Sequence, residues 1–516
     1  MKNYVLAHDL GTTGNKATLY DRDGALIASS FFAYGTRYDQ VGWAEQNPQD
    51  WWQAVCDSTR TLLRSVPGLR ADEIGCIVFS GQMMGCVPLD KNARPLRNAI
   101  IWADQRAVEQ ERWLAERIAP EEVYRITGHR LSASYSLPKM LWLRDHQPDI
   151  YRQTYKFVHA KDAMVARLTG KFVTEPSDGS SMNLYDLEQG AWSSRIIDAA
   201  NLNPDQLPDI VRSIDVVGEL LPDAAEEVGL TPGTPVVIGG GDGACAAVGA
   251  GVVTEGAAYN YIGSSSWIAL TTARPIYDPD QKTFTFGHII PDMFMPTGTM
   301  QAAGASYQWT RDNLAPMEAK AAEELGISAY EIINLGAEKS PVGANGLIYL
   351  PYLLGERSPR WNPRARGAFV GLTIRHTRHD MVRAVLEGVT FNLRVILDCF
   401  RKHSETGSGA QIDAMRVIGG GARGRFWNRI MADIYGMPVR RMSILEEATS
   451  MGAAVAGGVG VGLYKDFSII EQMNHIAETI QPDPAAQAQY DRIYPIFEAT
   501  YNALLPIYDQ IAELNA

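Results

Sequence analysis

The sequence has few cysteines, no dense cluster of basic residues and no long apolar run. Its five cysteines are scattered and contain no Cys-x-x-Cys pair, which argues against a disulfide framework and a zinc site. The net charge of −12 argues against a nucleic-acid-binding surface, which needs clustered Lys and Arg. Glycine or charge interrupts every apolar stretch well short of the ~20 residues that span a membrane. We therefore expect no nucleic-acid partner and no membrane insertion.

Two further signals are missing. The N-terminal residues show no basic segment followed by an apolar one, so no secretory signal is predicted and a reducing, cytoplasmic location is expected. The Gly-x-x-x-x-Gly-Lys-Ser/Thr phosphate-binding motif is absent as well. Any nucleotide must therefore be bound by another arrangement. The length of 516 residues is too great for one hydrophobic core and predicts at least two domains.

Near the middle of the chain, an apolar run at 236–238 leads into three glycines and then Asp242. This pattern predicts a buried strand, a tight turn and the start of a helix. It places Asp242 at the carboxyl end of a strand, where a substrate can lie against glycine backbone. The alternative is an ordinary turn whose aspartate caps a helix. The stretch alone leaves both interpretations open.

Each half of the chain opens with a predicted β-hairpin whose tip is rich in Gly, Ser and Thr. The first tip spans residues 11–14 and the second spans 263–266. Small loops of this kind bind phosphate oxygens through converging N–H and O–H groups. One such tip is best explained as a plain turn, but two, each opening a half, predict a shared polyphosphate site. Asp9 precedes the first tip and is expected to hold a divalent cation, most simply Mg²⁺.

A third glycine turn, at residues 419–422, lies between a predicted strand at 415–418 and a predicted helix at 426–435. Its flat backbone could lie against a purine ring, and the helix start adds N–H donors. An amphipathic helix is predicted at 377–401, and another helix covers the last thirty residues.

Taken together, these elements resemble the FGGY carbohydrate kinases of the actin, Hsp70 and sugar kinase superfamily, with the xylulokinase branch most similar. The matching segments run through the whole chain: 8–14 (HDLGTTG), 42–48 (GWAEQNP), 51–52 (WW), 81–85 (GQMMG), 101–104 (IWAD), 239–243 (GGGDG), 263–265 (GSS), 355–359 (GERSP), 367–369 (GAF) and 419–423 (GGGAR).

The resemblance implies an α/β fold with two ribonuclease H-like domains facing across a cleft. Residues 1–245 would form the sugar-binding domain and residues 246–480 the ATP-binding domain. Residues 481–516 would form a C-terminal helix that we expect to pack back on the first domain. The family is often dimeric, so a homodimer is also an expectation.

The resemblance also implies roles for individual residues. Asp242 would be the general base, and Asp9 and Asp242 would hold Mg²⁺. The expected ATP-binding residues are Gly11, Thr12, Thr13, Asn15, Lys16, Gly263, Ser264, Ser265, Gly420, Gly421 and Ala422. The expected sugar-binding residues are Gln82, Met83, Met84, Trp102, Asp242 and Gly243.

The expected reaction is transfer of the γ-phosphate of ATP to a small sugar, D-xylulose giving D-xylulose 5-phosphate. Two residues depart from the xylulokinase pattern: Met84 stands in place of His, and Gly243 in place of Asn. A methionine cannot replace the hydrogen bonds of an imidazole. A kinase of another sugar, a gluconate-like sugar acid or a polyol therefore remains an alternative. A non-kinase ATPase of the actin or Hsp70 type is another, although the pairing of a sugar-facing loop with Asp242 disfavours it.

Overall fold

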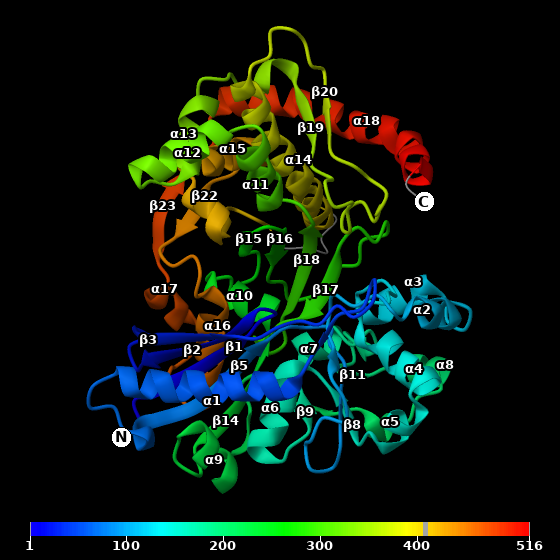
Figure 1. The fold of residues 1–516 in the computed structure, drawn as a ribbon, viewed down its shortest axis with the longest axis vertical. Coiled ribbons are helices and arrows are strands. Elements are labelled where there is room, and N and C mark those ends of the chain that lie inside the picture. Colours follow the sequence, from blue (N-terminus) through cyan, green and yellow to red (C-terminus); the bar gives the residue numbers. More distant parts are fainter. Residues whose placement is uncertain (1, 406–410, 515–516) are drawn as a thin grey trace.

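The structure is a computed structural model that describes residues 2–405 and 411–514. It has two domains, each built around a central sheet (Figure 1). The first sheet has six strands in the order β13-β14-β5-β1-β2-β3. The second has seven, in the order β17-β18-β16-β15-β21-β22-β23. In the described part of the chain, no helix combines the length and apolarity needed to cross a membrane.

The first sheet begins as an antiparallel meander and continues with parallel strands. The meander consists of β1 (Tyr4–Leu10), β2 (Gly14–Asp21) and β3 (Leu26–Ala33). Strands β5 (Ile74–Gly81) and β14 (Pro235–Gly241) then run parallel to β1, and β13 (Val216–Glu219) closes the edge. All of β5 and most of β14 are buried, as expected for parallel strands covered on both faces.

The second sheet repeats this order. The antiparallel strands are β15 (Ala258–Ile262), β16 (Ser266–Leu270) and β18 (Phe294–Met300). The parallel strands are β21 (Met415–Ile418) and β22 (Val439–Met442), and the edges are β17 (Phe284–Gly287) and β23 (Ile476–Ile480). Two sheets with the same strand order confirm the predicted pair of ribonuclease H-like α/β domains.

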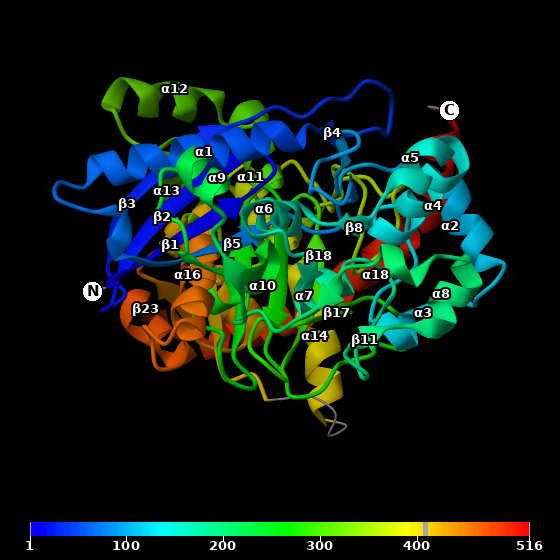
Figure 2. The ribbon, with the colours of Figure 1, turned by 90° about the horizontal axis from the view of Figure 1, so that it is seen from below.

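In the first domain, helix α1 (Pro48–Ser65) lies along β2 and β3 (Figure 2). Asn47 caps it by accepting a hydrogen bond from the Gln49 N–H, and Trp51 and Trp52 bury the inner face. The other helices of the domain are α2 (Val108–Ala115), α3 (Pro120–Thr127), α4 (Ser136–His146), α5 (Pro148–Gln153), α6 (Ala160–Thr169), α7 (Pro176–Ser180), α8 (Ser194–Ala200) and α9 (Pro222–Val228). Short strands connect them: β4 (Glu45–Gln46), β6 (Val87–Leu89), β7 (Ala99–Ile100), β8 (Lys156–Val158), β9 (Val173–Thr174), β10 (Tyr185–Asp186), β11 (Ala191–Trp192) and β12 (Asp209–Ile210).

In the second domain, the predicted amphipathic helix is α14 (Arg378–Glu405), and the helix predicted after the third glycine turn is α15 (Arg425–Tyr435). Both predictions are confirmed. The face of α14 that carries Val382, Leu386 and Val389 lies in the core of this domain. The remaining elements are α11 (Gly304–Asn313), α12 (Pro316–Leu325), α13 (Ala329–Ala337), α17 (Ile470–Met473), β19 (Ile348–Leu350) and β20 (Ala368–Val370).

Two helices join the domains. Helix α10 (Asp242–Gly249) and helix α16 (Ala448–Gly460) pack closely against each other between the two sheets (Figure 1). Helix α16 also covers β1 and β5 on the face opposite α1. The predicted division after residue 245 therefore falls inside α10. Residues 448–460, which the prediction assigned to the second domain, cover the sheet of the first, because their many small residues allow close packing there.

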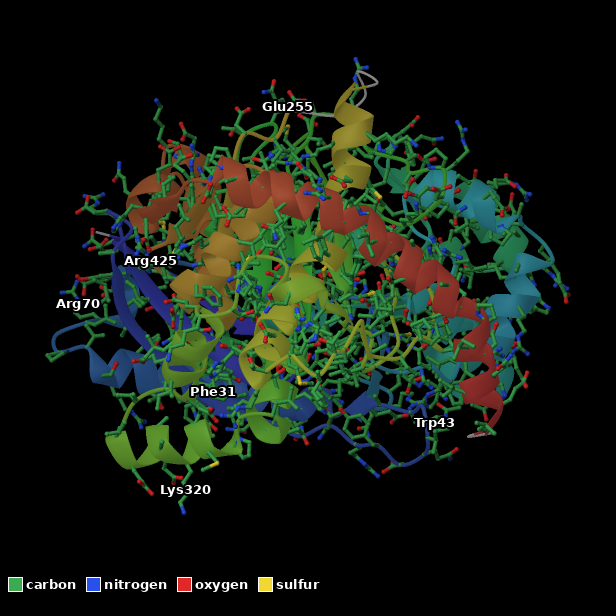
Figure 3. The ribbon with its side chains drawn as sticks, turned by 90° about the horizontal axis from the view of Figure 1, so that it is seen from above. Phe31, Trp43, Arg70, Glu255, Lys320 and Arg425 are labelled. Atoms are coloured by element: carbon green, nitrogen blue, oxygen red, sulfur yellow. The ribbon has the colours of Figure 1, made fainter. Side chains whose placement is uncertain are left out.

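The C-terminal helix α18 (Pro484–Leu514) does not pack back on the first domain as we expected. It lies along the outside of the second domain, where it contacts α14, α15 and β19 (Figures 1 and 3). The reason is its apolar face: Tyr490, Phe497, Tyr501 and Tyr508 are buried in the core of the second domain.

Candidate active site

Asp242 and Asp9 emerge at the same edge of the first sheet. Strands β14, β5 and β1 lie side by side and run parallel, and Gly241, Gly81 and Leu10 align across them. Asp242 directly follows this row and Asp9 directly precedes it. With neighbouring strands about 4.8 Å apart, the two backbones are separated by roughly 10 Å. The sheet thus brings together the two carboxylates that the sequence predicted as a metal site.

These two carboxylates form a partly buried pair of like charges. Burial and the negative charge of Asp9 raise the pKa of Asp242 to about 7. Burial raises the pKa of Asp9 to about 6, and the positive charge of Lys16 opposes this shift. Oxygen ligands of this kind suit Mg²⁺, and a divalent ion between them would relieve the repulsion.

The end of β14 before Asp242 needs glycine because neighbouring atoms touch its backbone. Gly239 has φ +71°, and a Cβ there would lie 1.8 Å from the carbonyl oxygen of Phe79. A Cβ on Gly241 would lie 2.7 Å from the sulfur of Met83. Asp242 begins α10, and its Oδ1 accepts a hydrogen bond of 2.7 Å from the N–H of Gly243. The predicted strand and helix start are present, but the predicted tight turn is not: the three glycines belong to β14, which passes directly into α10 at Asp242.

The first predicted phosphate-binding tip connects β1 and β2. Its backbone is closed by a 3.1 Å hydrogen bond from the Gly11 N–H to the Gly14 carbonyl. The Thr12 carbonyl accepts a 2.7 Å hydrogen bond from Gln46, and the side chain of Thr13 is exposed. A loop held in this way, with the Thr13 side chain exposed, is suited to hold phosphate oxygens.

Asn15 and Lys16 follow this tip but point to opposite faces of β2, as successive strand residues do. The Asn15 side chain is fully buried, where its Nδ2 contacts His8 at 3.0 Å and donates to Ser58 at 2.8 Å. The structure therefore does not bring Asn15 to the phosphate tip. Lys16 lies on the open side, 3.6 Å from Glu447 at the start of α16.

The second tip, at residues 263–265, connects β15 and β16 and rests on the start of α11. The carbonyl of Gly263 accepts from the Gly304 N–H at 2.9 Å, and the Ser264 side chain is exposed. Behind this tip lies a cavity of about 620 Å³. Its walls come from the tip, from α11 and α13 and from the third glycine turn, and they include Tyr261, Gly263, Ser264, Tyr307, Asn334, Gly420, Gly421 and Trp427.

Of the three residues of this turn that were expected to bind ATP, Gly420 and Gly421 line this cavity and Ala422 does not. Ala422 is fully buried in the core of the second domain, and its carbonyl accepts a 2.8 Å hydrogen bond from Asn428. A Cβ on Gly420 would meet no atom within 4 Å, so its backbone is open to a ligand. The glycine turn is thus a wall of the cavity, while the next residue anchors it.

The predicted sugar-facing loop follows β5. Gln82 is 2% exposed and donates a 2.7 Å hydrogen bond to Gln46. Met83 is 5% exposed and packs under Gly241, so it supports the end of β14 from the core. Met84 has φ +60° and is partly exposed, and its N–H donates to Ser181 at 3.2 Å. Of the two methionines, only Met84 is placed to touch a ligand.

Trp102 and Lys139 complete this side of the site. The Trp102 ring is 36% exposed, and its Nε1 donates a 2.9 Å hydrogen bond to the Thr12 hydroxyl. The ammonium of Lys139 is buried and donates to the carbonyls of Met84, Ile101 and Ser134 at 2.8, 2.9 and 2.5 Å. Lys139 thus ties together the loops that carry Met84 and Trp102. Sequence reasoning missed it, although a lysine within the apolar stretch 137–143 is a visible signal.

Sequence reasoning also missed a buried charged cluster behind Asp242. Lys161 is fully buried and lies 2.6 Å from Asp162, 3.0 Å from Asp178 and 3.4 Å from Glu175. Glu175 accepts from the Ser177 hydroxyl at 2.6 Å, and that hydroxyl accepts from the Gly241 N–H at 2.9 Å. This chain of contacts holds the residue before Asp242 to the interior of the first domain.

Three side chains of the same region, His159, Asp162 and Asp178, lie close enough to share a metal ion. The ammonium of Lys161 already neutralises both aspartates, however, and leaves little reason for a cation there. Asp9 and Asp242 are the better candidates for a cation, because they are partly exposed at the sheet edge where substrates can approach, whereas Asp162 and Asp178 are fully buried.

Comparisons with known proteins agree with this fold. The N-terminal domain model of the FGGY family of carbohydrate kinases matches residues 4–249, and the C-terminal domain model matches residues 258–461. The xylulose kinase of Bacillus subtilis (strain 168) is 34% identical over 499 residues, which is 96% of each chain. The gluconokinase of Bacillus licheniformis is 30% identical over 99% of this chain and 98% of its own. Among solved structures, the ligand-bound xylulose kinase from Lactobacillus acidophilus superposes with a TM-score of 0.90 at 27% identity, covering 98% of this chain and 99% of its own.

The two ribonuclease H-like domains have the ATPase fold that sugar kinases share with actin and Hsp70. The chain belongs to the FGGY family of carbohydrate kinases. It is accordingly an ATP-dependent sugar kinase, similar to the xylulose kinases and also to gluconokinases.

Proposed function

We propose that this kinase transfers the γ-phosphate of ATP to a hydroxyl of a small sugar with Asp242 as the general base. The observation that carries the proposal is the placement of Asp242, a carboxylate at the edge of the first sheet with a pKa raised to about 7. A base with a pKa near the working pH combines the ionised form with a useful driving force for proton transfer.

In the proposed reaction, a sugar hydroxyl oxygen attacks the γ-phosphorus while its proton passes to Asp242. A new oxygen–phosphorus bond forms, the bond from the γ-phosphorus to the β–γ bridging oxygen breaks, and ADP leaves. Phosphoryl transfer of this kind depends mainly on positioning and on charge stabilisation. Closure of the two domains would exclude water, which otherwise competes with the sugar as nucleophile.

The donor set at the sheet edge fits Mg²⁺. The carboxylates of Asp9 and Asp242 would hold the ion, which would supply positive charge to the phosphate oxygens. Around it, the hydroxyls and N–H groups of Thr12, Thr13 and Ser264 would hold the phosphates. Lys16 would turn from Glu447 to the phosphates, since its ammonium lies on the open face of β2.

The 620 Å³ cavity of the second domain is the proposed adenosine site. It lies directly behind the second tip, and Gly420 and Gly421 present bare backbone to it. Tyr307 and Trp427 supply ring surface for a purine, and the amide of Asn334 supplies polar contacts.

For the sugar, D-xylulose is the first candidate, because the xylulose kinase of Bacillus subtilis matches this chain over nearly its whole length. Met84 and Trp102 would face it. A gluconate-like sugar acid is the second candidate, supported by the similarity to the gluconokinase of Bacillus licheniformis.

The test is a coupled ADP-release assay over a panel of ketopentoses, aldonates and polyols. We expect D-xylulose to stimulate ADP release most, and a larger stimulation by an aldonate would favour the second candidate. Asp242→Asn should lose phosphoryl transfer and keep ATP binding, while Asp23→Asn, an exposed carboxylate on the β2–β3 turn, serves as the control. A protein that releases ADP at the same rate with every sugar and with water alone would contradict the kinase proposal.

A further inference from the structure

Three aromatic side chains lie together on one face of the β15–β16 hairpin. Tyr259 and Tyr261 are two residues apart on β15, so they share a face of the sheet. Trp267 on β16 pairs directly with Tyr261. This face looks toward the first domain, because all three side chains belong to or pack on the core cluster that contains α10 and α16.

The three side chains contact one another in series. The rings of Tyr261 and Trp267 are stacked, with centroids 4.1 Å apart and an angle of 14° between planes. The indole Nε1 of Trp267 donates a 2.7 Å hydrogen bond to the Tyr259 hydroxyl. That hydroxyl donates in turn to the carbonyl of Gly243 at 3.0 Å.

The series has one end at the nucleotide side and the other at the base. Tyr261 lines the 620 Å³ cavity behind the second phosphate-binding tip. Gly243 follows Asp242, and its N–H donates to the Asp242 carboxylate at 2.7 Å. An unbroken path of contacts therefore joins the wall of the nucleotide cavity to the carboxylate that would take the sugar proton.

We propose that Tyr259 is a positioning residue of the kinase reaction, which fixes Asp242 through Gly243 and makes its alignment depend on the nucleotide cavity through Trp267 and Tyr261. This inference rests on the function proposed above. Tyr259 touches neither the expected substrates nor the reacting atoms. It acts only through the backbone of Gly243.

The hydrogen-bonding capacity of the Tyr259 hydroxyl supports this role. A phenol has one hydrogen to donate, and here the acceptor is the Gly243 carbonyl. Tyr259 is fully buried, and burial raises the pKa of its hydroxyl, so the group stays protonated and remains a donor at physiological pH. The indole of Trp267, which is a donor only, fixes the orientation of the hydroxyl from the other side.

The two domains thus hold Asp242 from both sides. The Ser177 hydroxyl of the first domain accepts from the N–H of Gly241, the residue before Asp242. The Tyr259 hydroxyl of the second domain binds the carbonyl of Gly243, the residue after it. Any change in the position of the second sheet is therefore transmitted to the base.

The kinetic test compares Tyr259→Phe with Tyr464→Phe. Both tyrosines belong to the same core cluster, and the hydroxyl of Tyr464 donates to the Asp21 carbonyl away from the site. We expect Tyr259→Phe to lower kcat between about tenfold and about 100-fold, since a base misplaced by ~1 Å can cost ~100-fold. The KM for ATP should stay within about twofold, and Tyr464→Phe should keep the wild-type kcat.

A second set of variants tests the series of contacts that runs from Tyr261 through Trp267 and Tyr259 to Gly243. Trp267→Phe retains a ring to stack on Tyr261 but removes the indole N–H, so it should lower kcat less than Tyr259→Phe. The double variant should be no slower than Tyr259→Phe, because the indole N–H has then already lost its partner. A wild-type kcat in Tyr259→Phe, or losses that multiply in the double variant, would overturn the proposal.

Hydrogen exchange provides a readout that needs no sugar. In the unliganded protein, Tyr259→Phe should speed amide exchange in the segment 239–247, whereas Tyr464→Phe should not. ADP should slow this exchange in the wild type and should slow it much less in Tyr259→Phe. Calorimetry should measure separately how tightly each protein binds ADP. Unchanged exchange in Tyr259→Phe would refute the positioning role even if no sugar proved to be a substrate. If Tyr259→Phe altered the exchange but no sugar stimulated ADP release by the wild type, only the proposed reaction would be refuted.

Discussion

Gly452 on α16 faces the carbonyl oxygen of Cys245 on α10 so closely that a Cβ on the glycine would lie 1.9 Å from it. The contact is reciprocal, because a Cβ on Gly249 of α10 would lie 1.8 Å from the carbonyl oxygen of Ala448. The two helices that join the domains therefore touch backbone to backbone at two points. No side chain larger than hydrogen fits at either point.

The first prediction concerns this contact. Gly452→Ala must push α16 away from α10, and overpacking of this kind typically costs about 1–3 kcal/mol. We expect a lower thermal unfolding midpoint and weaker activity, because the shift of α10 also moves Asp242. Gly35→Ala is the matched control, since a Cβ there meets no atom within 4 Å. Equal midpoints for the two variants would contradict the close packing.

The second prediction concerns the stability of the Mg²⁺-free protein. The native pKa of Asp242, about 7, lies above its ordinary value of 3.8, so the native state holds the proton more tightly than the unfolded state. Stability contributed by this group is therefore lost as the pH rises from about 4 to about 7, and the cost is fully present at pH 8. Asp242→Asn should raise the free energy of unfolding at pH 8 by at least ~1 kcal/mol, as one pKa unit corresponds to about 1.4 kcal/mol.

At pH 4 the two proteins should unfold at nearly the same temperature, because Asp242 is then protonated in the native state. Thermal scans at both pH values, with and without Mg²⁺, provide the measurement. Added Mg²⁺ should stabilise the wild type more than Asp242→Asn. If Asp242→Asn were less stable than the wild type at pH 8, the ionised Asp242 would not be destabilised by burial and by the charge of Asp9.

The third prediction concerns activity against pH. Since Asp242 must be ionised to accept a proton, kcat/KM for the sugar should fall at low pH, and bound Mg²⁺, which favours the carboxylate, should place this limb below the metal-free pKa of about 7. The same limb should shift to lower pH when Asp9 is replaced by Asn, because the Asp9 charge contributes to the raised pKa of Asp242. A pH profile that is flat between about 3.5 and about 8, a range that includes both the ordinary and the metal-free pKa of Asp242, would argue against Asp242 as the base.

The fourth prediction concerns Lys139. Lys139→Met leaves the carbonyls of Met84, Ile101 and Ser134 without their donor, and each buried unpaired group costs about 1–3 kcal/mol. We expect a clear loss of stability and a rise in the KM for the sugar that exceeds the rise for ATP. Lys320→Met, at an exposed lysine on α12 (Figure 3), should change neither. Equal rises in both KM values would indicate a general loss of structure instead.

The fifth prediction concerns sugar choice. Met84 has φ +60°, a conformation in which His is more readily accepted than most side chains. Met84→His should therefore fold, and an added hydrogen bond of about 0.5–1.5 kcal/mol should raise kcat/KM for D-xylulose by roughly two- to tenfold. Met83→His, at a position buried under Gly241, should instead destabilise the protein. An unchanged preference in Met84→His would show that this position does not contact the sugar.

Local patterns predicted most of the fold. The apolar run at 236–238, its glycines and the periodicity of 377–401 are each visible within a short window, and the corresponding elements β14 and α14 are present. The alternation of strand residues would also have separated Asn15 from Lys16. The position of both residues beside the first tip nevertheless favours the expectation that both bind ATP.

Contacts between distant segments could not be read in this way. The Ser177 hydroxyl meets the N–H of Gly241 across 64 positions of sequence, and the packing of α16 on β1 joins opposite ends of the chain. Neither segment carries a local signal for its partner. The glycines of α16 predict close packing but not the partner, because small residues allow close contact with many different surfaces.

The position of α16 also determines how this chain can be divided. A fragment that ended after α10 would lack the helix that covers β1 and β5, and it would expose Val5, Ala7 and Val78 to water. A fragment that began at β15 would carry α16 with no sheet to cover. Neither half should fold independently, so the two domains should unfold in one transition. Separately expressed halves should become soluble only when they are produced together.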